Sequence, residues 1–252
     1  MSFDVAAEAY FRFMGRFAEP LADEFVVYAD VQPGQRALDV GCGPGALTAR
    51  LVDRLGVDSV AAIDPSAPFV DATRHRFPGI DVRAGAAERL PYDNGTFDLA
   101  LAQLVVHFMT DPLAGLREMV RVTRPGGTVA ACVWDHGGGT GPLSLFWRAV
   151  HDVDPDADDE GDLAGSRAGH LADLFQQASL AEVEPSSVSV TLEFATFDEW
   201  WEPFALGVGP AGAYVAGLDD TGRAEVRAAA RRRLPDVPFT ITASAWTVRG
   251  KA

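Results

Sequence analysis

The hydrophobic positions in the first half of the chain fall into short blocks separated by helical patterns. Five apolar blocks predict buried strands at residues 36–40, 59–64, 80–85, 96–106 and 128–134. Between the first two blocks, Leu47, Leu51 and Leu55 recur four apart, which predicts a helix with one buried face. Strands that alternate with helices in this way predict right-handed crossovers and a parallel sheet covered on both faces.

The second half has a different pattern. Residues 135–163 are rich in Gly, Pro and Asp and predict an irregular segment, whereas residues 165–180 predict a helix. Alternating apolar and polar positions predict strands at residues 182–194 and 238–248. The stretch between these strands is aromatic and broken by glycines into short helical pieces, and it ends in a charged surface helix at residues 219–234.

Composition narrows the classes of protein that fit. Hydrophobic residues make up 48% of the 252 residues and charged residues 23%, which suits one globular domain with an elaboration. The net charge of −15 argues against a nucleic-acid partner, because phosphate binding depends on Lys and Arg. The N-terminal stretch contains Asp4 and Glu8 and no uninterrupted apolar run, so we expect no signal peptide and no membrane partner. The expected location is the cytoplasm.

No metal site is expected. Cys42 and Cys132 are the two cysteines, and their spacing fits neither a metal site nor a disulfide framework. The stretch "DVDPDADDEGD" at residues 152–162 alternates acids as a calcium loop does. However, Ala157 stands at the glycine position of such a loop and Leu163 at its closing bidentate position, so we predict a solvated acidic loop.

A glycine-rich loop follows the first predicted strand in "RALDVGCGPGALTARL". Gly41, Gly43 and Gly45 allow a tight strand-to-helix turn whose backbone N–H groups approach a ligand closely. Asp64 ends the second strand, where a carboxylate accepts hydrogen bonds from ribose hydroxyls. Either a dinucleotide or another adenosine-bearing cofactor fits this arrangement.

Asp39 discriminates between these cofactors. It lies in an otherwise apolar strand, two positions before the first glycine, and burial of a carboxylate is costly unless it is hydrogen-bonded or faces a cation. S-adenosylmethionine carries an α-ammonium group, whereas a pyrophosphate would be repelled. An NAD(P)-dependent oxidoreductase remains the alternative.

Four stretches together resemble the class I S-adenosylmethionine-dependent methyltransferases that act on small molecules, with a methyltransferase type 11-like domain. They are "ALDVGCGPG", "AAIDPS", "AGAAERLPYDNGTFDLALAQLVVHF" and "LREMVRVTRPGGTVAACVW", and the resemblance covers residues 36–133. It implies a Rossmann-like three-layer α/β sandwich with a mostly parallel sheet, an antiparallel C-terminal strand and a helical cap insertion. The expected single domain 1–252 divides into N-terminal lid helices (1–35), a cofactor-binding half (36–134) and a substrate cap with the last two strands (135–252).

The resemblance also implies cofactor contacts. The glycine loop would cradle the methionine end of the cofactor, Asp64 would bind the ribose, and Gln103 would approach the amino acid portion. Many relatives carry an Asp at the position of Ala86 that binds the adenine, so here that contact would fall to Ala87, Glu88 or water. The complete set of expected cofactor residues is Asp39, Gly41, Gly43, Gly45, Asp64, Pro65, Ala86, Ala87, Glu88 and Gln103.

The sequence features that indicate the acceptor site are less specific than those that indicate the cofactor site. His107, in "LVVHFM", is a candidate general base or a packing histidine. Tyr10 and Arg16 are candidate lid contacts or helix-packing residues. Aromatic residues of the second half would line an apolar acceptor pocket or form core. The expected acceptor residues are Tyr10, Arg16, His107, Trp134, Trp200 and Trp201.

The predicted reaction is methyl transfer to an O, N or C nucleophile of a small apolar or aromatic metabolite, with S-adenosylhomocysteine as product. Besides the oxidoreductase, a non-catalytic protein that binds S-adenosylmethionine remains open, because the family has no obligatory catalytic residue. The expected partner is a small-molecule acceptor, and the expected assembly is a monomer or homodimer.

Overall fold

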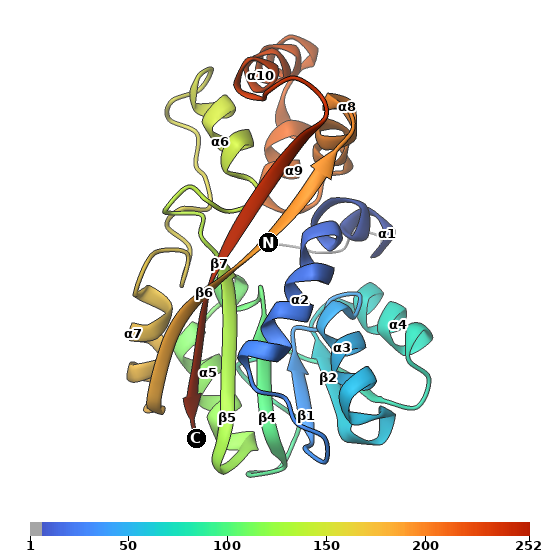
Figure 1. The fold of residues 1–252 in the computed structure, drawn as a ribbon, viewed down its shortest axis with the longest axis vertical. Coiled ribbons are helices and arrows are strands. Elements are labelled where there is room, and N and C mark those ends of the chain that lie inside the picture. Colours follow the sequence, from blue (N-terminus) through green and yellow to red (C-terminus); the bar gives the residue numbers. More distant parts are fainter. Residues whose placement is uncertain (1–6) are drawn as a thin grey trace.

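A seven-stranded sheet forms the centre of the computed structural model, which describes residues 7–252 (Figure 1). The strand order is β3-β2-β1-β4-β5-β7-β6. The strands are β1 Ala37–Val40, β2 Val60–Asp64, β3 Asp81–Ala84, β4 Phe97–Gln103, β5 Thr123–Trp134, β6 Ala181–Phe194 and β7 Phe239–Lys251.

The first five strands pair in parallel, and β7 runs antiparallel to both of its neighbours, β5 and β6. This confirms the predicted Rossmann-like sheet with one antiparallel strand among the last two. β1 lies between β2 and β4, with Asp39 opposite Ala62 on one side and Leu101 on the other. All four residues of β1 are buried, which explains why the strand is apolar except for Asp39.

Helices cover both faces of the sheet, and each face has its own core. Leu38 and Val40 of β1 belong to the core that includes α5 and α7 residues, whereas Ala37 belongs to the core that includes α2 and α3 residues. The α-helices are α1 Ala7–Tyr10, α2 Arg16–Tyr28, α3 Ala46–Leu55, α4 Ala67–Arg76, α5 Pro112–Val122, α6 Ser144–His151, α7 His170–Gln177, α8 Phe197–Trp201, α9 Gly209–Gly217 and α10 Asp220–Arg233.

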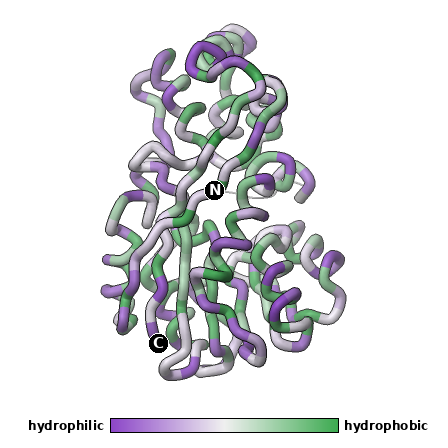
Figure 2. The backbone as a smooth tube through the Cα atoms, in the orientation of Figure 1, coloured by the Kyte–Doolittle hydropathy of each residue, from purple (hydrophilic) through white to green (hydrophobic). Residues whose placement is uncertain are grey.

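A helical cap stands beyond the carboxyl ends of the parallel strands. β7 pairs with β5 only from Ala245 onward, and its earlier half continues away from the sheet paired with β6 alone. This two-stranded ribbon leads to α6, α8, α9 and α10 at the top of the molecule (Figure 1). Hydrophobic colour runs along the central strands and hydrophilic colour marks much of the topmost helix α10 (Figure 2), as expected for a charged surface helix.

The boundaries of β4 and β5 differ from the sequence prediction at the edges of the site. β4 ends at Gln103 and not at residue 106, because the chain turns there and forms a 3-10 turn at Val106–Phe108. β5 begins at Thr123, directly after α5, and so includes the "RPGG" stretch. At the N-terminus, a π-helical turn at Phe11–Gly15 joins α1 to α2, and the first six residues of the predicted lid segment lie outside the described residues.

Candidate functional site

A cavity of about 310 Å³ opens at the carboxyl ends of β1, β2 and β4. This is the edge at which ligands bind in open parallel sheets, and the volume lies in the range of small-molecule sites. Six of the predicted cofactor residues line it, namely Asp39, Gly41, Gly43, Asp64, Pro65 and Gln103.

The glycine loop takes a backbone shape that side chains resist. Gly41 and Gly43 have φ of 72° and 52°, in the left-handed region that favours glycine. A Cβ on Gly41 would lie 2.4 Å from Val105, so close packing excludes a side chain there. A Cβ on Gly43 would meet nothing within 4 Å, and Gly43 lines the cavity. The backbone at Gly43 is therefore open to a ligand.

Asp39 lies under the loop and is 1% exposed. Its Oδ2 accepts a hydrogen bond of 2.6 Å from Thr48 Oγ1. Burial raises the pKa of Asp39 to about 7, and nearby Asp64 adds to the rise while Thr48 opposes it. A cationic group in the cavity would favour the ionised form of Asp39.

Asp64 joins the end of β2 to the glycine loop. Its Oδ2 accepts the backbone N–H of Gly43 at 2.8 Å, and its Oδ1 accepts the backbone N–H of Ser66 at 2.8 Å. Burial raises the pKa of Asp64, and the two backbone hydrogen bonds oppose that rise. The remaining lone pairs of this carboxylate are available to hydroxyl donors in the cavity.

Gln103 and Tyr10 complete the polar lining. The Gln103 side chain donates from Nε2 to the carbonyl of Ala18 in α2 at 2.8 Å, while its Oε1 is buried without a hydrogen-bond partner among the described residues. The Tyr10 ring meets Phe69 of α4 edge-on, with the ring centroids 5.4 Å apart. Burial, and then Asp64, raise the pKa of the Tyr10 hydroxyl, so it stays a neutral donor.

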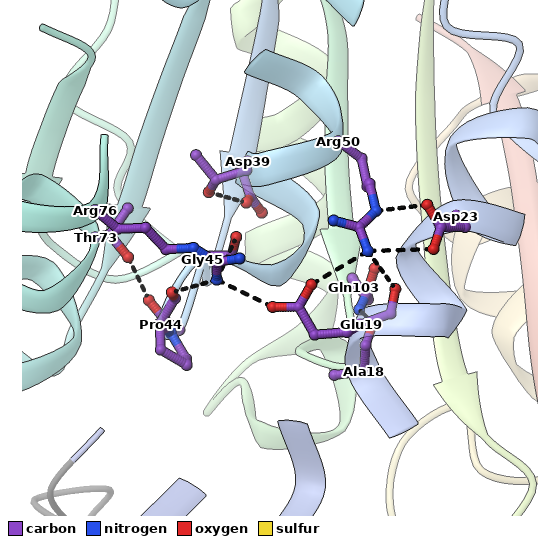
Figure 3. A network of polar contacts seen from close by, with 12 residues as sticks. Ala18, Glu19, Asp23, Asp39, Pro44, Gly45, Arg50, Thr73, Arg76 and Gln103 are labelled. Carbon is purple, nitrogen blue, oxygen red and sulfur yellow. Dashed lines mark hydrogen bonds and ion pairs between the residues drawn. The ribbon is translucent and has the colours of Figure 1, made fainter. Parts of the chain in front are cut away.

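An ion-pair network holds α2 over the glycine loop. Glu19 of α2 lies between Arg50 of α3 and Arg76 of α4, at 3.3 and 3.0 Å (Figure 3). Arg76 also donates to the carbonyl of Pro44 at 3.3 Å, within the loop itself. The same guanidinium therefore ties the N-terminal helix and the loop to α4.

A second cavity, of about 40 Å³, adjoins the first. The two share Tyr10, Leu104 and Phe108 as lining residues. Leu104 has φ of 62°, a conformation rare for a side chain with a Cβ, and its N–H donates to the carbonyl of Cys132 in β5. Backbone strain of this kind occurs often at functional sites.

The second cavity is apolar with a few buried polar groups. Its lining includes two of the expected acceptor residues, His107 and Trp134, and also His136 and Glu160. Burial, and then the nearby His136, lower the pKa of His107 well below its usual range; burial lowers that of His136 to about 4. Both rings are therefore uncharged at neutral pH. Glu160 accepts from Trp147 Nε1 at 2.8 Å, and burial raises its pKa to about 7.

Four predicted cofactor residues do not line the first cavity. Gly45 caps α3, with φ of 91° and the Phe77 ring against it. Ala86 is exposed and Ala87 is buried in the core beside α5. Glu88 Oε1 accepts the backbone N–H groups of Thr110 and Asp111 at 2.7 and 3.2 Å, so it organises the start of α5. Their assignment to the cofactor stays a prediction.

Three predicted acceptor residues line neither cavity. Arg16 pairs with Glu199 of α8 at 2.7 Å, which joins α2 to the cap. Trp200 and Trp201 are buried in the aromatic core of the cap against Phe204, with ring centroids 5.0 and 5.9 Å away. Their positions favour the packing interpretation over direct contact with an acceptor.

The fold also brings to the site residues that the sequence did not single out. The predicted solvated acidic loop is wrong at Glu160, which is 3% exposed and faces the second cavity. Asp158 and Asp159, which precede it in the chain, are exposed. The acidic stretch therefore does not indicate which of its carboxyl groups is buried. Phe108 and Phe69 line the first cavity, although the sequence marks them only as apolar positions near strand ends.

None of the helices within residues 7–252 has the length and apolar character needed to cross a membrane. Within the same described range, no cluster of three or more His, Cys, Asp or Glu side chains could hold a metal ion.

Comparison with known proteins shows that residues 38–131 are similar to a known family. Residues 38–131 match the methyltransferase domain family. An uncharacterized methyltransferase of Mycobacterium tuberculosis is 37% identical over 54% of this chain and 52% of its own length. The demethylmenaquinone methyltransferase of Paenarthrobacter aurescens is 34% identical over 48% of this chain and 46% of its own length. The chain thus spans about half the length of these curated relatives.

A solved structure extends the likeness to the fold. The geranyl diphosphate C-methyltransferase of Streptomyces coelicolor, in complex with Mg²⁺, geranyl diphosphate and S-adenosylhomocysteine, superposes with a TM-score of 0.54. The sequence identity is 13%, over 94% of this chain and 80% of that one. At this identity the likeness shows the fold alone.

Proposed function

We propose that the protein transfers the methyl group of S-adenosylmethionine to a small-molecule acceptor, because residues 38–131 match the methyltransferase domain family. The observation that carries this proposal is the adjacency of the two cavities. The first has carboxyl groups at the strand ends within a largely apolar lining, the second is almost wholly apolar, and they meet at Tyr10, Leu104 and Phe108. A donor and an acceptor held on opposite sides of this junction would be close enough for direct transfer.

The residues of the first cavity fit the cofactor. Asp64 offers its carboxylate to the ribose hydroxyls, and the unpartnered Gln103 Oε1 and the buried Asp39 offer acceptors to the α-ammonium group. The open backbone at Gly43 admits the amino acid portion, which a Cβ would obstruct. Phe69 and Pro65 supply apolar surface for the adenine. When bound there, S-adenosylmethionine supplies an electrophilic methyl group on a sulfonium.

The chain's own contribution is to position the reactants, exclude water and accept a proton. Leu104 and Phe108 keep water from the junction of the two cavities. His107 is uncharged at neutral pH, so its ring nitrogen is ready to accept a proton from an acceptor hydroxyl or amine. A carbon acceptor that is already nucleophilic would not need this base.

The acceptor we propose is a small apolar or aromatic molecule. The walls of the second cavity include Phe13, Met14, Leu143 and Val208, and neither Lys nor Arg is among its described lining residues. The name of one similar protein, a demethylmenaquinone methyltransferase, supports a small-molecule acceptor. The net charge of −15 disfavours a nucleic acid.

The oxidoreductase alternative conflicts with Asp39, a buried carboxyl group beneath the glycine loop that would repel a pyrophosphate. The experiment is a calorimetric titration with S-adenosylmethionine, S-adenosylhomocysteine and NAD, followed by detection of methyl transfer to a set of aromatic acceptors. We expect saturable binding of the first two ligands only. Binding of NAD alone would overturn the proposal, and cofactor binding without transfer to any acceptor would favour a non-catalytic binding protein.

A further inference from the structure

Two side chains of the second cavity each carry a buried nitrogen atom without a partner among the described residues. Trp134 Nε1 and His107 Nδ1 make no hydrogen bond to any described residue, although their side chains are only 1% and 6% exposed. Both side chains line the same cavity. A buried polar atom without a partner costs free energy, so a ligand group that satisfies both atoms would be stabilised there.

A hydroxyl group offers both kinds of hydrogen bond that these two atoms lack. The indole N–H of Trp134 can only donate a hydrogen bond, so it requires an oxygen acceptor. Nδ1 of a neutral histidine accepts a hydrogen bond when the proton is on Nε2. One hydroxyl oxygen accepts from Trp134 and donates its own proton to His107, whereas a carbonyl group would satisfy Trp134 alone.

The charges around the cavity select against anions. Glu160 is buried in its wall, and its Oε2 is held by Trp147 Nε1 at 2.8 Å. Since burial raises the pKa of Glu160 to about 7, its carboxylate is ionised above that pH, while His107 and His136 stay uncharged. An anionic ligand group would therefore meet a buried negative charge and no counter-charge among the described lining residues.

The cavity admits only the end of a ligand, since its free volume of about 40 Å³ is far below the roughly 150 Å³ of an apolar cavity that holds benzene. A ring would extend toward the first cavity, past the shared lining residues Tyr10, Leu104 and Phe108. The apolar part of the wall includes Phe13, Met14 and Leu143, which suit the face and edge of an aromatic ring.

We propose that Trp134, His107 and Glu160 form a selective acceptor site that binds the hydroxyl end of an uncharged phenol and rejects acceptors that carry a carboxylate or phosphate there. This inference rests on the proposed methyl-transfer function, since it names the class of acceptor for that reaction.

The test uses phenol, benzoate and benzylamine as probes of equal ring size and different charge, at pH 8. The protein has five tryptophans, so its ¹H–¹⁵N spectrum contains five indole signals, and Trp134→Phe identifies the one from Trp134. We expect phenol to shift this signal saturably and benzoate to bind at least about tenfold more weakly. Equal binding of phenol and benzoate, a preference for benzylamine, or an unmoved Trp134 signal would each overturn the proposal.

A charge-neutral variant tests Glu160 directly. Glu160→Gln keeps a hydrogen-bond acceptor for Trp147 and removes the negative charge, so the preference for phenol over benzoate should fall at least about fivefold. Asp158→Asn makes the same charge change on an exposed neighbour outside the cavity lining and should leave the preference intact. An equal effect of the two variants would contradict the role of Glu160. If Glu160→Gln does not fold, the probe series on the unmodified protein still decides.

Binding of S-adenosylhomocysteine, titrated without any probe, reports on the first cavity alone. Its failure would overturn the proposed function, whereas failure of the phenol preference with intact S-adenosylhomocysteine binding would overturn the acceptor class only. The two results are therefore distinguishable.

Discussion

Asp64 Oδ2 accepts the backbone N–H of Gly43 at 2.8 Å, which fixes the glycine loop to the end of the neighbouring strand. The sequence predicts the loop after β1 and the carboxylate at the end of β2 as two separate features. This hydrogen bond joins them into one wall of the first cavity. A ligand that bridges them therefore meets a site whose parts are already positioned, which lowers the entropic cost of binding.

Asp64→Ala should weaken binding of S-adenosylhomocysteine by about 1–3 kcal/mol. The variant removes the proposed acceptor for ribose hydroxyls and also frees the backbone N–H groups of Gly43 and Ser66. Calorimetric titration measures the change. Asp58→Ala, which removes an exposed carboxylate in the turn before β2, is the control and should bind as the unmodified protein does. Equal affinities of both variants would remove Asp64 from the site.

Gly43→Val should abolish cofactor binding and leave a folded protein. The side chain would project into the cavity, where a Cβ meets no protein atom within 4 Å. Gly34→Val is a matched control, because Gly34 also has a positive φ, of 88°, and open space around its Cβ, yet lies outside the cavity lining. Both variants should lose a similar amount of stability, on the order of 1–2 kcal/mol, from the strained backbone. Unchanged affinity in Gly43→Val would contradict the role of the loop.

The stability of the protein without cofactor should depend on pH through Asp39. The carboxyl group of Asp in an unfolded chain has a pKa of about 3.9. Burial raises the pKa of Asp39 in the folded protein to about 7. Between these values the folded protein retains a proton that the unfolded chain releases, so this residue's contribution to stability falls as pH rises and stays low above the folded pKa. Asp39→Asn should therefore stabilise the protein more at pH 8 than at pH 5.

Thermal unfolding of both proteins at the two pH values measures this difference. The amide of Asn can still accept the hydrogen bond from Thr48 Oγ1, so packing changes little. A stability gain that is the same at both pH values would show that Asp39 does not titrate in this range.

Trp201→Ala should destabilise the protein by about 3–5 kcal/mol, as expected for a large cavity in a core. Trp201 is 6% exposed and packs against Phe146 and Phe204 in the cap. Chemical denaturation measures the loss, with Phe11→Ala as the control because Phe11 is 49% exposed. A stable Trp201→Ala protein that binds cofactor but fails in methyl transfer would instead support the sequence-based assignment of Trp201 to the acceptor.

The sheet and the first cavity could largely be predicted from the sequence. Their signals are local: an apolar run ending in Asp39, glycines that permit positive φ, and an acid at the end of the next apolar run. Each signal lies within a few residues of the feature it predicts. Parallel pairing then brings the carboxyl ends of β1, β2 and β4 to one edge, as general rules of α/β folds require.

The second cavity could not be predicted in the same way, because its wall combines segments that are far apart in the chain. Leu104 adopts its left-handed conformation although nothing in "AQLVV" marks a turn, since tertiary contacts of β4 and β5 impose it. Glu160 and the exposed Asp158 lie in one acidic stretch, and only the packing of Trp147 against that loop separates their environments. Trp201 is a case in which the sequence signal was present but ambiguous. An aromatic residue in a cap can line a pocket or pack in a core, and only the packing around it decides between the two.

The position of β7 also affects the order in which the fold can form. β7 lies between β5 and β6 in the sheet, although both of those strands precede it in the chain. During synthesis on the ribosome, β6 therefore emerges before the strand that will connect it to the sheet, and the edge of β5 remains unpaired over that interval. Such an open edge can pair with other chains, so a nascent protein that stalls between residues 194 and 239 would be at its most prone to aggregation.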